Sequence, residues 1–183
     1  MGFSIKPLAV VSRSEDSIAA SVYPALVKFD RILSQVNGVM NAVEVESDYA
    51  GRLFFFGPGA GSLATASAVV SDLGLIARNQ GSTYPRLSGM EKLGNTYHDH
   101  STSSCYLRFD VVDEKGIFAR ITSALSDSGI SIDEVFQKNR DSGRASIVMI
   151  THPAREKDLE DCLSNVGEFG ELLQPMQRFR VLS

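Results

Sequence analysis

The chain has 183 residues, of which 43% are hydrophobic, and this is enough to form the core of one medium domain or two small ones. Acidic residues outnumber basic residues by 22 to 18, and the net charge of −4 is spread along the sequence. No basic stripe of the kind that neutralises nucleic-acid phosphates is present. We therefore expect a globular protein with no nucleic-acid partner.

Apolar runs such as Leu53–Phe56 are far too short to cross a bilayer, and no long apolar signal segment follows Met1. We expect a cytoplasmic protein with no membrane partner. Only two cysteines occur, Cys105 and Cys162, and both lie in apolar patterns rather than in a metal-type Cys-x-x-Cys pair. They are predicted to be buried free thiols.

Apolar stretches rich in β-branched residues open the sequence and predict strands at residues 5–11, 21–27, 41–46 and 52–56. Between them, residues 28–39 are expected to form an irregular connection with one short helical turn. The fourth strand runs into a glycine turn, after which apolar residues repeat at helical spacing. This spacing predicts a helix that begins near Leu63 and ends near Arg78.

Residues 79–104 are rich in glycine, serine and charged side chains and lack a sustained periodicity, so they are predicted to form a linker. Within this segment, His98, Asp99 and His100 are of the residue types that ligate metals. Adjacent side chains in a loop rarely converge on one ion, however, and no third ligand cluster is evident. We expect a solvated loop without a metal.

The remaining residues predict a βαββαβ order. The strands are expected at residues 106–112, 131–138, 145–151 and 173–182, and the helices at residues 118–128 and 154–166. This order folds as a four-stranded antiparallel sheet with both helices on one face, the ferredoxin-like architecture. Gly129 sits where a helix C-cap favours positive φ, and Pro153 is expected to open the second helix.

The glycine turn, residues 57–61, reads Gly-Pro-Gly-Ala-Gly and is followed at once by a predicted helix. Glycines let a backbone approach a ligand closely, and a helix start presents unpaired N–H groups and the positive end of a dipole. The turn lacks the last glycine of the dinucleotide motif G-x-G-x-x-G, so it is not that fingerprint. A close-packed strand-to-helix corner and a ligand site are both open interpretations.

A second loop, residues 113–119, lies between the first strand and first helix of the βαββαβ segment. Gly116 allows a tight turn, which leaves the amides of Ile117 and Phe118 at a helix start where they can hold a carboxylate. Asp113 can accept a hydrogen bond from an ammonium group, so the loop suits an amino acid. The alternative is that Asp113 simply caps the helix.

Two parts of the sequence resemble known families. Residues 36–43, Val-Asn-Gly-Val-Met-Asn-Ala-Val, with the glycine turn and residues 65–72, Thr-Ala-Ser-Ala-Val-Val-Ser-Asp, resemble the end of the homoserine dehydrogenase catalytic region over residues 2–78. Residues 104–182 resemble an ACT domain, whose D-x-x-G loop matches Asp113–Gly116, although Lys115 stands where proline is frequent. Many bacterial homoserine dehydrogenases end in this order.

The resemblance implies an α+β fold. A partial, mixed-sheet substrate and dimerisation domain is expected at residues 1–80, a linker at residues 81–103, and a ferredoxin-like βαββαβ ACT regulatory domain at residues 104–183. It also implies an NAD(P)-dependent oxidoreductase that interconverts homoserine and aspartate 4-semialdehyde in the biosynthesis of threonine, methionine and isoleucine.

The family's catalytic lysine and Rossmann domain lie before the segment matched here, so no catalytic residue is assigned, and neither Lys6 nor Lys28 has the catalytic context. This chain alone is expected to bind no cofactor and to lack dehydrogenase activity. Gly61, and with it Gly59, match positions that lie against the nicotinamide nucleotide in the family. They are the cofactor-binding candidates for the full-length enzyme.

The ACT resemblance implies a sensor of a small amino acid, and threonine is the family's usual feedback inhibitor. Paired ACT domains commonly place effector sites between two sheets, which gives the candidates Asp113, Gly116, Ile117, Phe118, Ser131 and Ile132. Apolar strand faces of the first domain need a cover, so at least a homodimer is expected. The alternative is a stand-alone amino-acid-binding regulatory module, against which the retained glycine turn argues.

Overall fold

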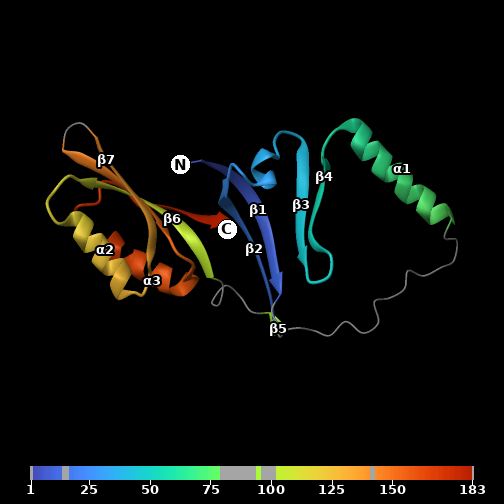
Figure 1. Cartoon of the computed structure of the whole chain (residues 1–183). Coiled ribbons are helices and arrows are strands. Elements are labelled where there is room, and N and C mark those ends of the chain that lie inside the picture. Colours follow the sequence, from blue (N-terminus) through green and yellow to red (C-terminus); the bar gives the residue numbers. More distant parts are fainter. Residues whose placement is uncertain (1, 14–16, 79–93, 96–101, 141–142, 183) are drawn as a thin grey trace. The chain divides into compact units, whose positions relative to one another are not determined.

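The computed structural model describes residues 2–13, 17–78, 94–95, 102–140 and 143–182 (Figure 1). Contacts along the chain divide it into two compact units. We call Met1–Lys28 together with Leu93–Ser183 the sheet unit, and Phe29–Lys92 the corner unit.

The sheet unit contains most of the strands. Its elements are β1 (Phe3–Arg13), β2 (Ser17–Lys28), β5 (Gly94–Asn95), β6 (Thr102–Val112), α2 (Ile117–Asp127), β7 (Ile132–Arg140), β8 (Arg144–Thr151), β9 (Ala154–Arg155), α3 (Glu156–Gly167) and β10 (Gln177–Leu182). The main sheet has the order β1-β2-β10-β6-β8-β7, and the short strands β5 and β9 pair with β2 and β6. Strand β2 pairs in parallel with β10 and β5, whereas the other pairs are antiparallel, so the sheet is mixed.

The part β10-β6-β8-β7 with α2 and α3 is the predicted ferredoxin-like arrangement, and both helices lie on one face of the strands (Figure 1). Alternate residues of β6 point to the helices, because successive side chains of a strand face opposite sides. The buried cluster that joins strands to helices includes Cys105, Leu107, Phe109, Val111, Ile121, Leu125, Ile147, Met149, Leu159, Cys162 and Val166. Cys105 and Cys162 are free and buried, as predicted.

The ends of the elements differ in places from the prediction. Strand β6 begins at Thr102 because β9 pairs with its first residues, and this pairing also holds Ala154 extended. Helix α3 therefore begins at Glu156 rather than directly after Pro153. Gly129 follows α2 with φ of 72°, the predicted left-handed position.

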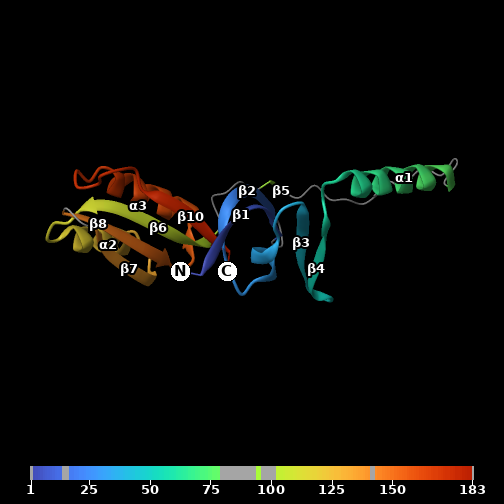
Figure 2. The same ribbon diagram turned by 90° about the horizontal axis from the view of Figure 1, so that it is seen from above.

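The first hairpin joins the C-terminal strand. In β2 and β10 the parallel pairs run from Ala25 with Arg180 to Val27 with Leu182, so β10 lies between β2 and β6 (Figure 2). A second buried cluster seals this junction and contains Leu26, Ile150 and Val181 packed with Phe3, Tyr106 and Phe179. Contacts thus group β1 and β2 with the ferredoxin-like part, although the sequence placed them in the predicted first domain, residues 1–80. The division at residues 80 and 104 stays a prediction.

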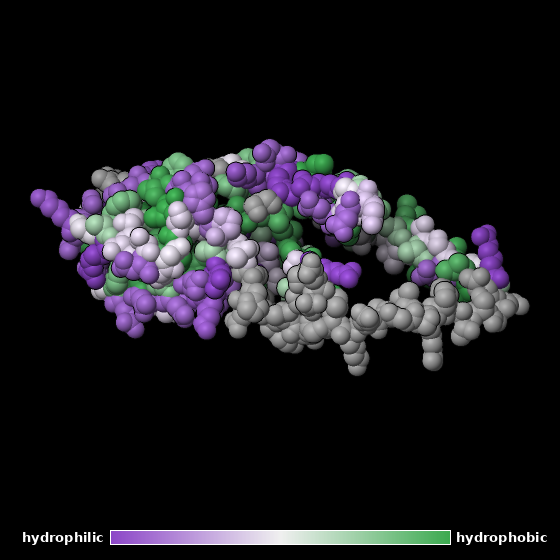
Figure 3. Space-filling model, turned by 60° about the horizontal axis from the view of Figure 1, so that its bottom comes forward, coloured by the Kyte–Doolittle hydropathy of each residue, from purple (hydrophilic) through white to green (hydrophobic). Residues whose placement is uncertain are grey.

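The corner unit consists of the 3-10 helix η1 (Ile32–Gln35), β3 (Met40–Ser47), β4 (Gly51–Pro58) and α1 (Ser62–Arg78). Strands β3 and β4 form an antiparallel two-stranded sheet. One face of it exposes Val43, Val45, Leu53 and Phe55, and helix α1 has no buried residue. Apolar side chains of α1 lie at the surface (green at the right of Figure 3).

Candidate functional site

The glycine turn forms a tight corner between β4 and α1. The N–H of Gly59 donates to the carbonyl of Val39 at 2.9 Å, which ties the corner to the start of β3. On its helix side, both the N–H and the hydroxyl of Thr65 donate to the carbonyl of Gly61, at 3.0 and 2.9 Å. Gly61 has φ of 122°, a conformation that side chains disfavour. The corner is therefore closely tied from both sides.

An ion-pair cluster supports the ribbon that leads to this corner. Glu44 of β3 is half-buried. Its Oε1 accepts a hydrogen bond of 2.9 Å from Nη2 of Arg31, which lies at the start of η1. Arg52 of β4 approaches the same carboxylate at 3.5 Å. These contacts fasten the connection after β2 to both strands.

The predicted effector loop begins α2. Gly116 is the N-cap residue with φ of 95°, and no side chain caps this helix. The interpretation of Asp113 as a helix cap is therefore not supported, and its exposed carboxylate lies in the loop before the helix start. The loop is held by its backbone, since the N–H of Asp113 donates to the carbonyl of Gly143 at 2.9 Å. Uncapped N–H groups at such a start favour an anionic group.

The six predicted effector residues fall into two groups within one chain. Ile117 is buried in the core, and Phe118 beside it is partly exposed. Ser131 and Ile132 follow the other end of α2, about 15 Å away along the helix at 1.5 Å per residue. The carbonyl of Ser131 accepts a hydrogen bond from the N–H of His152. One copy of the chain does not bring these residues together.

A small cavity of about 150 Å³ lies at the same end of the sheet as the loop and is lined by Asp110, Arg144, Ala145, Leu173 and Gln174. Asp110 is only 8% exposed and is bound by Arg108 at 3.0 Å and by Gln174. Burial raises the pKa of Asp110, but hydrogen bonds from Ser146, Arg108 and Gln174 and the charge of Arg108 together lower it. This carboxylate fastens the segment before β10 to β6.

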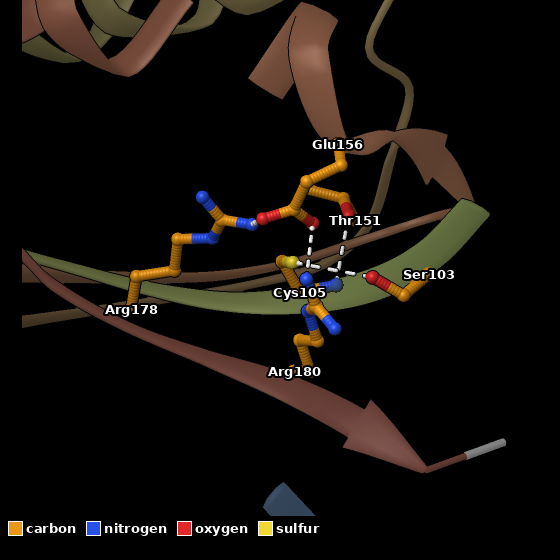
Figure 4. Close-up of polar contacts among 6 residues, drawn as sticks. All are labelled: Ser103, Cys105, Thr151, Glu156, Arg178 and Arg180. Carbon is orange, nitrogen blue, oxygen red and sulfur yellow. Dashed lines mark hydrogen bonds and ion pairs between the residues drawn. The ribbon is translucent and has the colours of Figure 1, made fainter. Parts of the chain in front are cut away.

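A second buried carboxylate lies at the start of α3. Figure 4 shows Arg178 and Arg180 of β10 pointing toward Glu156, which forms ion pairs with both. The distance from Arg180 Nη2 to Glu156 Oε2 is 3.2 Å, and the Arg180 guanidinium also lies 4.4 Å from the ring centre of Tyr23 in β2. Beside this cluster, the N–H of Cys105 donates to the hydroxyl of Thr151 at 3.0 Å. The cluster joins α3, β10 and β2.

The two buried carboxylates should make the stability of the folded protein sensitive to acid. Burial raises the pKa of Glu156, but Arg178 and Arg180 outweigh this effect, so the pKa of Glu156, like that of Asp110, lies below its ordinary value. A carboxylate whose pKa is lower in the folded than in the unfolded state stabilises the folded protein. This stabilisation is fully present at a pH above the unfolded-state pKa, and it is lost as the pH falls through the folded-state pKa. Urea unfolding should therefore show a falling free energy of unfolding below about pH 4.5. A free energy that stays constant from pH 5 to pH 3 would contradict the prediction.

Comparisons with known proteins identify both parts of the chain. Residues 1–73 match the sequence model of the homoserine dehydrogenase family, and residues 106–165 match that of the ACT domain. A homoserine dehydrogenase of Helicobacter pylori is 35% identical over 98% of this chain, and one of Bacillus subtilis is 34% identical over 99%. The chain belongs to the homoserine dehydrogenase family. It spans about 43% of the length of these two relatives.

Solved homoserine dehydrogenases share the fold over the whole chain. The enzyme from Thiobacillus denitrificans matches with a TM-score of 0.89 and 30% identity, and 43% of its chain is covered. The Staphylococcus aureus enzyme at pH 7.5 matches with a TM-score of 0.62 and 26% identity, with 42% of its chain covered. The predicted resemblance and fold class are confirmed.

In the part of the chain that the structure describes, no group of three or more His, Cys, Asp or Glu side chains is arranged to hold a metal, and His98, Asp99 and His100 lie outside that part. Within the same residues, no helix has both the length and the apolar character needed to span a membrane. The glycine corner and the α2 loop stay the two predicted sites.

Proposed function

We propose that this chain is the C-terminal, regulatory part of a homoserine dehydrogenase that interconverts homoserine and aspartate 4-semialdehyde with NAD(P) in the cytoplasm. The observation that carries the proposal is the order of two features in one chain. A strand–glycine–helix corner of the family's pattern is followed by an ACT domain whose first helix starts uncapped at Gly116. The corner then serves the cofactor through Gly59 and Gly61, and the ACT domain senses an amino acid.

The proposal assigns no catalytic group to this chain. Proton transfer in the dehydrogenase reaction requires a positioned acid or base, and hydride transfer requires a bound nicotinamide. We expect the 183-residue chain to show no turnover of homoserine with NADP or NAD in a spectrophotometric assay. Turnover above background that is absent from a mock purification would contradict the proposal that this chain holds no catalytic group.

We propose threonine as the effector, bound by its carboxylate at the start of α2 and by its ammonium group at Asp113. The uncapped helix start and the exposed carboxylate support this assignment. Ser131 and Ile132 lie too far away in the same chain, so in this proposal a second copy supplies them. The effector site is then complete only in a dimer.

The free edge of β7 supports such a pairing. Among the described strands, β7 pairs only with β8, so its other edge is open. If two β7 strands pair antiparallel about Phe136, Glu134 of each copy stands opposite Lys138 of the other. Opposite charges in directly opposed positions stabilise a strand pair. The arrangement is thus self-complementary in charge.

The same register brings the two groups of effector residues to one end of the sheet. Arg140 at the end of β7 pairs with Arg144, and Arg144 pairs with Val112, the residue before the loop. In the proposed pair, Ile132 of the second copy falls opposite Arg140. The loop of one copy therefore lies at the same end of the sheet as the start of β7 of the other, about three strand spacings or 14 Å away.

Threonine titration tests the effector assignment. A ligand at ten times its dissociation constant stabilises the folded state by about 1.4 kcal/mol, which a thermal shift detects. We expect this shift for the unaltered chain, and we expect Asp113→Asn to need at least a tenfold higher threonine concentration for the same shift. The neighbouring Glu114→Gln, in the same loop, is the matched control and should behave as the unaltered chain. A missing shift at millimolar threonine, or an equal response of both variants, would refute the assignment.

A further inference from the structure

The glycines of the corner are required for different physical reasons. A side chain at Gly61 would meet no atom within 4 Å, but its φ of 122° disfavours any side chain there. Gly59 has no such backbone requirement, since it is absent from the positive-φ glycines. A Cβ at Gly59 would instead lie 1.5 Å from Nδ2 and 2.5 Å from Cγ of Asn41. Of the described glycines, this is the one whose added Cβ meets a neighbour within 4 Å.

Asn41 thus occupies the space that a side chain at position 59 would take. Asn41 lies in β3 opposite Gly57 of β4, so its side chain projects from the ribbon next to the turn. The N–H of Gly59 is bound to the carbonyl of Val39, two residues before Asn41, at 2.9 Å. The start of β3 therefore holds the middle of the corner twice, once by its backbone and once by the Asn41 side chain.

We propose that Asn41 is a positioning residue that fixes the glycine corner against β3 and so sets where the nicotinamide cofactor docks. The inference rests on the proposed function, because it needs the corner to face the cofactor. Asn41 acts by filling space against Gly59, and Gly61 then presents its backbone and the start of α1 in a fixed place. A misplacement of about 1 Å at such a contact costs up to about a hundredfold in rate.

The test uses the complete enzyme that carries this segment behind its cofactor domain. Asn41→Ala removes the packing contact, and Gly59→Ala displaces the Asn41 side chain. Each is expected to weaken NADPH binding, measured by fluorescence titration, by at least about twofold, the lower end of the effects found for residues in contact. Since both break one contact, the double variant should bind no more weakly than the weaker single variant. Asn41→Leu, which keeps a similar shape without polar atoms, should restore most of the affinity.

Two comparison variants separate this mechanism from general damage. Gly61→Ala is strained by its backbone, so its effect should add to that of Asn41→Ala. Gly74→Ala lies in α1, where an added Cβ meets nothing within 4 Å, and it should leave NADPH binding unchanged. Additive effects of Asn41→Ala and Gly59→Ala, or unchanged NADPH binding in both, would overturn the proposal.

The melting temperature of the cofactor-free enzyme gives a second readout. The same non-additive pattern is expected there, because the contact exists without the cofactor. If the unaltered enzyme fails to bind NADPH, the proposed function fails. Non-additive melting temperatures would then still show that Asn41 fixes the corner, whereas additive ones would refute that role as well.

Discussion

Replacing Glu156 by alanine is expected to lower the free energy of unfolding of the sheet unit by about 3–5 kcal/mol, the cost of removing one partner from a buried ion pair. Glu156 is 7% exposed, and the side chains of Arg178 and Arg180 are 22% and 15% exposed. After the substitution, both guanidinium groups remain largely shielded from water but no longer have a carboxylate partner. Urea unfolding monitored by circular dichroism measures the change.

The control for this experiment is Glu160→Ala on the exposed side of the same helix, which should change the free energy by less than about 0.5 kcal/mol. Glu156→Gln keeps the shape and removes the charge, so it should fall between the two. It should also flatten the dependence of stability on acid pH. A loss below about 1 kcal/mol for Glu156→Ala would show that water replaces the carboxylate.

Reversing the charge of Lys138 is expected to weaken self-association of the chain. In the proposed β7 pairing, Lys138→Glu turns two attractive contacts with Glu134 into two repulsive ones. At about 0.2–1 kcal/mol for each cross-strand pair, the total change is about 1–4 kcal/mol. Since every 1.4 kcal/mol is tenfold, the dimer dissociation constant should rise at least about fivefold. Sedimentation analysis at several concentrations measures it.

The double variant Glu134→Lys with Lys138→Glu exchanges the charges and should restore the dimer. Lys157→Glu on the exposed surface of α3 carries the same charge change elsewhere and should have no effect. A second interface through the exposed apolar faces of the corner unit would be unaffected by all three variants. A monodisperse monomer of the unaltered chain, or a double variant as weak as Lys138→Glu, would rule out the β7 pairing.

The elements followed from local patterns because each depends on periodicity over a few residues. Alternation predicted β3, and helical spacing predicted α1 up to Arg78, where it ends. The start of α3 was misplaced because the pairing of Ala154 with Ser103 joins positions that are distant in the sequence. No local signal reports such a contact.

The candidate site was predictable in its parts but not in its assembly. The D-x-x-G loop predicted the turn at Gly116, and the structure has it, yet α2 separates that loop from Ser131 by its full length. Glu156 was missed because its charge partners lie more than 20 residues away on β10. The local signal was a pair of arginines, Arg178 and Arg180, on either side of Phe179 in β10.

The parallel pairing of β2 with β10 has a consequence for how this regulatory part can be exchanged between proteins. An ACT segment excised at the linker would leave behind the hairpin and bare the outer edge of β10, including Val181 and its neighbour Phe179. Bare strand edges recruit other chains and promote aggregation. A transplantable sensor cassette should therefore include residues 2–28 alongside residues 102–182, although these two stretches are discontinuous in the gene.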